Sequence, residues 1–458
     1  MAIPLSDASL QTRVRVILPS MTFPAVELAK IHGIRYYEER FLVLALMAAQ
    51  RARAVYVTSV PVAPEIVDYC VSLAPDPERT RERITFVALD DPSPVSLSQK
   101  LADRPDALER IRKQAGPDAF LYPFNVTDYE IRIADALDVP IFGPDAEHIH
   151  LGSKTGSRTV AKRAGAGVLD GAEGLRNLDD VENAIRGIRP GAEGFVIKFN
   201  HGFSGMGNAI IHREDLRWPV TDTPTVFCSG DESWPGYARK IAEQGAIVEE
   251  LVTGEGVTSP SVQVQLFPSG RVEILSTHDQ VLGDPRRQVY LGCRFPADDA
   301  YRAMITGQAR AMADVLADEG VIGPFGVDFI VVPDDGAFVS EINLRMGGTT
   351  HPHATARFVT GGTYDQATGL LTAADGGERY YVGTDNLKAD ALRGRSPSWV
   401  LERLSRAGLL FDPRTATGTT VHMLGAVAEY GKLGTVCIAG SLAAAADLAE
   451  ETTRVLTG

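Results

Sequence analysis

Two carboxylates and one amide in a short segment have the types and spacing of metal ligands. The segment GVDFIVVPDDGAFVSEINLRMGG holds the turn signal PDDG (333–336) between two apolar stretches, which predicts a β-hairpin. If the hairpin is symmetric about its two central turn residues, Asp328 lies opposite Glu341, and the strand period of two puts Asn343 on the face of Glu341. Facing carboxylates repel each other, and a divalent cation removes that repulsion. We therefore predict that these three residues bind Mg²⁺, which prefers oxygen ligands; a solvent-facing acidic hairpin is the alternative.

A glycine-rich loop joins two other predicted strands. The segment FVIKFNHGFSGMGNAII carries Lys198 on its first strand and Gly202, Gly205 and Gly207 in the loop. Glycines let backbone N–H groups approach phosphate oxygens, and a lysine adds positive charge. A dinucleotide fingerprint requires a helix after the loop, whereas AIIHRE predicts a strand. This order favours a flap that closes over a nucleotide, with an ordinary glycine-rich hairpin as the alternative.

Strand-like and helix-like segments alternate through residues 1–145. The apolar runs RVRVIL, AVYVTS, ITFVAL, FLYPF and PIFG predict strands with helical segments between them. Such alternation is typical of a parallel sheet covered by helices. We expect an α/β, Rossmann-like N-terminal domain at 1–145. It has no GxGxxG after its first strand, so we assign it no dinucleotide.

The rest of the chain is organised differently. For 146–370 we expect an α+β domain of hairpins with one long helix, and for 371–458 a C-terminal region that completes the fold. The stretch 370–396 is the least ordered-looking part of the sequence, and we expect it to be a mobile connection.

Composition argues against several classes of protein. Hydrophobic residues make up 44% of the 458 and charged residues 23%, which is ordinary for a globular protein. The formal net charge is −14 and no basic stripe is present, so we expect no nucleic-acid partner. The four cysteines form no CxxC pair, which argues against a zinc ribbon or a redox dithiol. The N-terminus lacks a signal-peptide pattern and the apolar runs are too short to span a bilayer, so we expect a cytoplasmic protein without a membrane partner.

These motifs, in this order, resemble the ATP-grasp superfamily over roughly residues 140–350. FGPDAEHIHLGSKTGSRTVAKRAGAGV is similar to the family's entry segment, in which a lysine begins a helix and reaches the nucleotide phosphates; Lys154 has that position. Lys198 matches the second phosphate lysine, and HGFSGMGN matches the flap. IVEELVTGE resembles the segment that links the two grasping lobes and holds adenine. The acidic hairpin matches the family's metal triad. The resemblance therefore implies an ATP-grasp fold preceded by the Rossmann-like domain.

The resemblance also implies individual roles. The Glu250 carbonyl and the Val252 N–H would hydrogen-bond to the adenine edge, and Glu255 would bind the ribose. Arg345 matches an arginine that follows the triad and would stabilise the tetrahedral oxyanion, with Arg294 as a second catalytic candidate. The nucleotide site implied in full is Lys154, Lys198, Ser204, Gly205, Met206, Gly207, Glu249, Glu250, Leu251, Val252 and Glu255.

Four further residues have open roles. Arg286 and Arg287 could reach the γ-phosphate, although a surface position is as good an interpretation for them, as it is for Arg294. His351 and His353 follow the triad and could line an acceptor pocket, but an isolated histidine is more often structural.

The implied activity is that of an ATP-dependent carboxylate–amine ligase. A carboxylate would attack the γ-phosphate of ATP, and an amine would attack the resulting acyl phosphate, with release of ADP and phosphate. ATP and Mg²⁺, as two ions bridged by Glu341, are the expected cofactors. The donor would be an amino-acid-like carboxylate and the acceptor an amino acid or a peptide N-terminus. A homodimer is a further expectation, because dimers are frequent in the superfamily.

A closer resemblance and two alternatives remain. The ending GTTVHMLGAV…GKLGTVCIAG and the N-terminal domain are similar to the pheganomycin-type peptide ligases, which join an unusual amino acid to a peptide N-terminus. One alternative is an ATP-grasp carboxylase that activates bicarbonate, although such enzymes usually serve a biotin carrier and no AMKM-like motif is present. The other is a non-catalytic nucleotide-binding regulator, which would be favoured if the metal acids or the lysines were missing.

Overall fold

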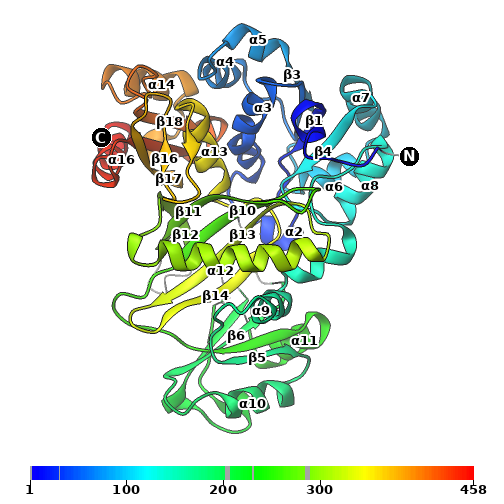
Figure 1. The fold of residues 1–458 in the computed structure, drawn as a ribbon, viewed down its shortest axis with the longest axis vertical. Helices are drawn as coiled ribbons and strands as arrows, with labels where there is room; N and C mark the ends of the chain where they lie inside the picture. Colours follow the sequence, from blue (N-terminus) through cyan, green and yellow to red (C-terminus); the bar gives the residue numbers. More distant parts are fainter. Residues whose placement is uncertain (1–2, 30, 202–206, 229–231, 284–288) are drawn as a thin grey trace.

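The computed structural model describes residues 3–29, 31–201, 207–228, 232–283 and 289–458, and its strands form three sheets (Figure 1). Within these ranges, no helix combines the length and the apolar character needed to cross a bilayer.

The first sheet is parallel, with strand order β3-β2-β1-β4, as the alternating pattern predicted. Its side chains divide between two cores, because successive residues of a strand point to opposite faces. Val16 and Val55 pack in the core beneath α6, α7 and α8, whereas Ile17 and Tyr56 pack in the core that contains α3. The elements are α1 (Ser9–Thr12), β1 (Val14–Leu18), α2 (Ala25–Leu28), η1 (Ile34–Phe41), α3 (Leu42–Ala49), β2 (Ala54–Thr58), α4 (Pro64–Ser72), α5 (Pro77–Glu82), β3 (Ile84–Ala88), α6 (Leu97–Ala102), α7 (Pro105–Ala115), β4 (Ala119–Pro123) and α8 (Asp128–Leu137).

The second sheet is five-stranded and forms the lobe at the bottom of Figure 1. Its central strand β6 is buried along its whole length, because β9 and β7 flank it and α10 and α11 contribute to the same core. The elements are η2 (Ala146–Gly152), α9 (Lys154–Arg163), β5 (Gly171–Leu175), α10 (Leu178–Gly187), β6 (Gly194–Phe199), β7 (Asn208–His212), η3 (Arg213–Asp215), η4 (Val220–Asp222), β8 (Val226–Phe227), α11 (Trp234–Gln244) and β9 (Ala246–Glu250).

The third sheet has ten strands and lies in the middle of the molecule, with α12 across it (Figure 1). One stripe of α12 is buried at helical spacing, from Ile305 through Ala309 and Met312 to Leu316. The elements are β10 (Pro260–Leu266), β11 (Val272–Gly283), β12 (Val289–Phe295), α12 (Asp299–Asp318), β13 (Gly323–Val332), β14 (Gly336–Asn343), α13 (Thr350–Val359), β15 (Thr363–Tyr364), β16 (Leu371–Thr372), β17 (Glu378–Lys388), η5 (Asp390–Leu392), α14 (Pro397–Arg406), β18 (Gly418–His422), η6 (Leu424–Ala426), α15 (Val427–Tyr430), β19 (Lys432–Ala439) and α16 (Leu442–Thr457).

The expectation of a mobile connection at 370–396 is wrong. This stretch contains β17, which pairs with β12 on one side and β19 on the other. Its residues alternate strictly between buried and less buried positions, which is the pattern of an integral sheet strand. The third sheet therefore runs from β10 to β19 across the expected boundary at residue 370, and the division into 1–145, 146–370 and 371–458 stays a prediction.

Candidate active site

The N-terminal turn of α9 holds Lys154 at the end of the second sheet. The hydroxyl of Ser153 caps the helix by accepting the Gly156 N–H at 3.0 Å. The Lys154 N–H donates to the carbonyl oxygen of Asn200, just after β6, at 3.2 Å. A side chain at Gly156 would lie 2.3 Å from a backbone oxygen, so only glycine fits there. These contacts hold the first turn of α9 in place. From there the Lys154 ammonium forms an ion pair with the carboxylate of Glu341 in the third sheet.

The hairpin β13–β14 pairs Asp328 directly with Glu341, as predicted, and pairs Gly326 with Asn343. The register nearer the turn differs from the symmetric one, because Val332 pairs with Gly336 and the three residues 333–335 form the turn in place of two. A β-bulge after Asp328 absorbs the extra residue of β14 and restores the predicted register at the acidic end.

The three predicted metal ligands are in contact with one another. The Asn343 amide donates to Asp328 Oδ2 at 2.9 Å and to Glu341 Oε1 at 3.3 Å. The Gln280 amide of β11 donates to Asp328 Oδ1 at 2.9 Å. Arg345 Nη2 donates to Asn343 Oδ1 at 2.6 Å. Two carboxylates and an amide oxygen on one face of a sheet form a donor set suited to a hard divalent cation.

Burial of these charges changes their proton affinities. Burial raises the pKa of Asp328, although Lys154 and Arg345 act in the opposite direction. Burial also lowers the pKa of Lys154 to about 7, and the nearby positive charge of Lys198 adds to that effect. The pKa of Arg345 falls to about 10, again chiefly through burial. Ionisable groups from both lobes therefore crowd into one poorly hydrated space.

A second ionic group supports the other lysine. The Glu249 carboxylate is 1% exposed and accepts from Lys198 Nζ and from Arg158 Nη1, each at 2.6 Å. Although burial acts to raise the pKa of Glu249, these two cations hold it below its usual value. Arg158 lies one helical turn after Lys154 on α9, so its spacing is the signal that could have identified it from sequence.

One cavity of about 1080 Å³ connects these groups. Its size is at the upper end of the usual range for small-molecule sites. The second sheet, the β13–β14 hairpin and the segment after β9 all contribute to its wall. Ten of the predicted residues line it: Lys154, Lys198, Glu249, Glu250, Leu251, Val252, Asp328, Glu341, Asn343 and Arg345.

A similar protein of known activity accounts for this arrangement. The chain is 30% identical to the L-propargylglycine–L-glutamate ligase of Streptantibioticus cattleyicolor, over 97% of this chain and 94% of that protein. The chain belongs to the ATP-grasp ligase family. This membership confirms the prediction of an ATP-dependent ligase that forms an amide bond.

Family models and solved structures agree with the assignment of this ATP-grasp ligase. Residues 221–365 match the family "IQCH-like, ATP-grasp", and residues 400–452 match the "PGM1 C-terminal domain". The biotin carboxylase domain of the Hydrogenobacter thermophilus 2-oxoglutarate carboxylase has a TM-score of 0.60 at 13% identity, covering 96% of this chain and 89% of that one. The N5-carboxyaminoimidazole synthetase of Staphylococcus aureus has a TM-score of 0.55 at 13% identity, covering 97% of each chain. These two likenesses confirm the predicted ATP-grasp fold.

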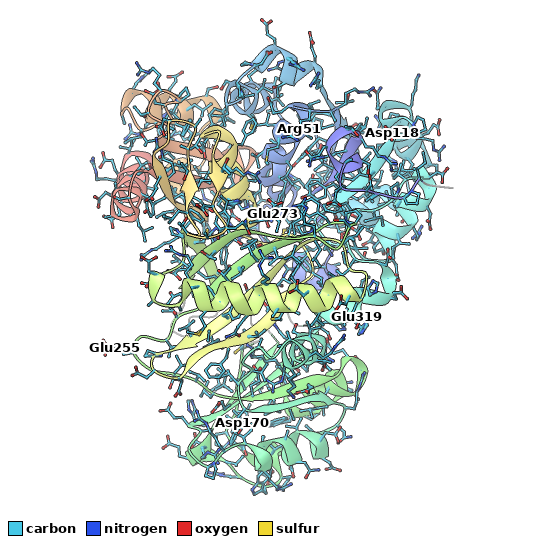
Figure 2. All side chains as sticks on the ribbon, viewed as in Figure 1. Arg51, Asp118, Asp170, Glu255, Glu273 and Glu319 are labelled. Atoms are coloured by element: carbon cyan, nitrogen blue, oxygen red, sulfur yellow. The ribbon has the colours of Figure 1, made fainter. Side chains whose placement is uncertain are left out.

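Some predicted residues of this ATP-grasp ligase lie outside the cavity. Glu255 is exposed at the edge of the molecule (Figure 2), and Arg294 is exposed on β12; neither is among the described residues that line the cavity. Gly207 precedes β7, and its carbonyl accepts from the hydroxyl of Tyr237 at 2.8 Å. Ser204, Gly205 and Met206 lie outside the described residues, as do Arg286 and Arg287.

The two histidines after the triad are buried in this ATP-grasp ligase. His351 is 1% exposed and His353 is 5% exposed, and neither is among the described residues of the cavity wall. His353 lies in an aromatic environment, with its ring centroid 6.0 Å from that of Phe295. This position favours the structural interpretation of these histidines over a place in an acceptor pocket.

Proposed function

We propose that this ATP-grasp ligase joins the carboxylate of one amino acid to the amine of another amino acid, or of a peptide, through an acyl phosphate. The observation that carries the proposal is that Asp328, Glu341 and Asn343 of the third sheet face the same cavity as Lys198 of β6 and Lys154 at the start of α9. Phosphoryl transfer needs positioned positive charge on both sides of the triphosphate, and this arrangement can supply it.

The residues of the triad fit a magnesium site. Asp328 and Glu341 face each other at a cross-strand pair, and burial raises the pKa of Asp328, so a divalent cation would relieve an unfavourable concentration of negative charge. Asn343 would supply the amide oxygen. We propose that the site takes Mg²⁺, as two ions with Glu341 shared between them. The metal would neutralise the oxygens of the transferring phosphoryl group.

The protein's own residues would hold the phosphates and stabilise the oxyanion. Lys154 and Lys198 would hold the phosphates, with Glu249 and Arg158 keeping Lys198 in place. Arg345 lies beside the triad and can donate to the oxyanion that forms when the amine attacks the acyl phosphate. The reaction needs no covalent nucleophile from the protein.

The nucleotide base would lie along the segment after β9. We propose that the Glu250 carbonyl and the Val252 N–H bind the adenine edge, because both residues line the cavity at the junction of the two lobes. Glu249 would act through Lys198, since both of its carboxylate oxygens are already bonded to cations. The exposed position of Glu255 gives no support to a ribose contact.

The substrates named for the similar ligase provide the first assay. We expect ADP release to depend on an added amine, and we would test L-glutamate and L-propargylglycine together and singly, followed by other amino acids and short peptides. A preference for peptide acceptors would support the pheganomycin type, and a preference for single amino acids would argue against it. ADP release that requires bicarbonate but no amine would identify a carboxylase. Nucleotide binding without turnover under any of these conditions would identify a regulator.

A further inference from the structure

Part of the cavity wall comes from η1 and from strands β17 and β19, away from the β13–β14 hairpin and the second sheet. Tyr37 and Arg40 of η1 line the cavity, together with Asp385 at the middle of the third sheet and Lys432 at the start of β19. None of these residues belongs to the motifs that predicted the nucleotide and metal site. Their charges therefore need another explanation.

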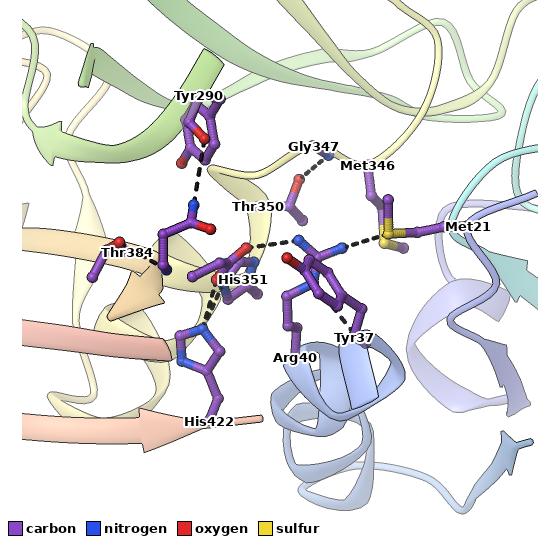
Figure 3. Close-up of polar contacts among 12 residues, drawn as sticks. Met21, Tyr37, Arg40, Tyr290, Met346, Gly347, Thr350, His351, Thr384 and His422 are labelled. Atoms are coloured by element: carbon purple, nitrogen blue, oxygen red, sulfur yellow. Dashed lines mark hydrogen bonds and ion pairs between the residues drawn. The ribbon is translucent and has the colours of Figure 1, made fainter. Parts of the chain in front are cut away.

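Arg40 is held in a fixed orientation by Asp385. Its Nη1 lies 2.7 Å from Asp385 Oδ2, and both side chains are about 5% exposed. The other carboxylate oxygen, Oδ1, lies 2.9 Å from His351 Nε2 and 2.7 Å from His422 Nε2. Arg40 and the two imidazoles keep the pKa of Asp385 well below its usual value despite burial. The two Nε2 atoms are also 3.1 Å apart, so Asp385 and both imidazoles form one hydrogen-bonded cluster. Figure 3 shows Arg40 between this histidine pair and Met21.

The free edge of Arg40 lacks a strong acceptor. Its Nη2 donates to the thioether sulfur of Met21 at 3.0 Å, and a thioether is only a weak acceptor. Met21 also lines the cavity, so this edge of the guanidinium borders open space. The guanidinium has five N–H donors, and the bonds to Asp385, Met21 and the Tyr37 carbonyl leave two of them for a carboxylate.

A second cation, Lys432, lies beside Arg40. Lys432 Nζ donates to the hydroxyl of Tyr37 and lies 4.9 Å from the ring centroid, while Arg40 Cζ lies 4.6 Å from the same centroid. Burial lowers the pKa of Lys432; Asp385 acts in the opposite direction, and the neighbouring Arg40 adds to the lowering. Among the described residues, Lys432 forms no ion pair with a carboxylate.

The local charge is therefore unbalanced in favour of an anion. Arg40, Lys432 and Arg345 all border this part of the cavity, and Arg40 and Lys432 both lie against the ring of Tyr37. Asp385 offsets one of the three charges, and the triad engages Arg345. Packing like charges together in a poorly hydrated space costs free energy that a bound anion would recover.

We infer that Arg40 and Lys432 bind a carboxylate of an amino-acid substrate that is not consumed in the reaction. The inference rests on the proposed ligase function and makes it more specific. One carboxylate would be activated beside Arg345 and the triad, and the second would be held by Arg40 and Lys432. Asp385, His351 and His422 are positioning residues that fix the guanidinium. The site would then reject a substrate whose second carboxyl group is a neutral amide.

Binding measurements test this inference without requiring turnover. With Mg²⁺ and a non-hydrolysable ATP analogue present, calorimetry would compare L-glutamate with its α-amide and its γ-amide, and L-propargylglycine with its amide. In the wild type we expect at least one acid to bind about 10- to 100-fold more tightly than its amide, the range for a charge-assisted hydrogen bond. In Lys432→Gln this preference should shrink at least severalfold, because the acid loses affinity and the amide does not.

Matched variants keep the inference falsifiable. Lys113→Gln removes an exposed lysine of α7 and should retain the wild-type preference. Arg40→Gln could unfold the protein by leaving Asp385 unpaired, so Arg40→Lys is used instead; it keeps the charge, loses the planar fork and should give an intermediate preference.

The possible outcomes separate the inference from the proposed function. Three outcomes would overturn the inference. The wild type could bind acid and amide equally, it could bind no acid, or the preference for the acid could survive in both Lys432→Gln and Arg40→Lys. Amine-dependent turnover would then still support the ligase. Conversely, the protein could prefer the acid, lose that preference in Lys432→Gln, and show no amine-dependent ADP release. That result would support the carboxylate site and contradict the ligase.

Discussion

Asp328 of β13 and Glu341 of β14 lie directly opposite each other, and the next pair toward the turn is displaced by a β-bulge. β14 is the edge strand of the third sheet, and its Ile342 N–H donates outside the sheet to the hydroxyl of Ser157 on α9 at 2.8 Å. The helix that begins at Lys154 is thus bonded to the strand that carries Glu341 and Asn343. The two halves of the proposed catalytic site are coupled through this contact.

Removal of a carboxylate from the triad should abolish turnover without unfolding the protein. We expect Glu341→Gln and Asp328→Asn each to lower kcat about 1,000-fold, because the metal loses a charged ligand. The fold should survive in each variant, because removal of either carboxylate leaves the other beside Lys154. Steady-state ADP release and a thermal melt measure the two effects. Asp334→Asn alters the exposed turn of the same hairpin and should retain full activity; full activity in Glu341→Gln would refute the metal assignment.

Lys198 should be needed for turnover and dispensable for folding. We expect Lys198→Ala to lower kcat about 100-fold or more, because the phosphates lose a positive charge in a poorly hydrated site. The fold should survive because Arg158 continues to pair with the buried Glu249. Lys162→Ala, which removes a more exposed lysine of α9, is the control. A Lys198→Ala protein with wild-type kcat and KM for ATP would remove Lys198 from the phosphate site.

The contact between α9 and β14 should contribute measurably to stability. Ser157 is fully buried, so Ser157→Ala leaves the Ile342 N–H without an acceptor and should cost about 1–3 kcal/mol. We also expect a lower kcat, because Lys154 and Glu341 lose their shared support. Thermal unfolding and ADP release would be compared with Thr159→Ala, an exposed position on the same helix. Equal melting temperatures for the two variants would contradict the proposed coupling.

His353 should make stability depend on pH. Burial lowers its pKa from 6.5 to about 3, and neither ring nitrogen has a hydrogen-bond partner among the described residues. Between these values the unfolded chain binds a proton that the folded chain does not, so stability falls as pH decreases below 6.5. The contribution lost between pH 8 and pH 5 should be about 2 kcal/mol.

The variant His353→Leu isolates this effect. Leucine cannot titrate and loses no hydrogen bond, so we expect the variant to be at least as stable as the wild type at pH 8 and more stable at pH 5. Melting temperatures across this range measure the difference. His150→Gln, at an exposed histidine, should keep the wild-type slope. The same slope in His353→Leu would show that other groups cause the pH dependence.

The position of Asp328, Glu341 and Asn343 on one face of the hairpin could be predicted because its determinants are local. A strong turn signal and a period of two suffice for it, even though the turn is one residue longer than a symmetric hairpin gives. Glu255 and Arg294 show the limit of this reasoning. Glu255 was assigned from the family resemblance and Arg294 from its place on an expected strand, but the direction in which each side chain points depends on packing that no local pattern encodes.

The carboxylate site had no comparable local signal. Arg40 and Asp385 are 345 positions apart, and Lys432 lies in a different strand from both. The pairing of β17 with β12 and β19 brings Asp385 and Lys432 to the cavity, and the ion pair with Asp385 holds Arg40 of η1 at the same place. The expectation that 370–396 is a mobile connection concealed this relationship.

The order of motifs along the chain was enough to determine the fold class, the nucleotide chemistry and the acidic hairpin, because each depends on residues a few positions apart. The tertiary structure decided which charges share a low-dielectric space: Glu249 between Lys198 and Arg158, and Asp385 between Arg40 and two histidines. Such pairings join segments that are distant in sequence, and they become defined only when the sheets pack and exclude water.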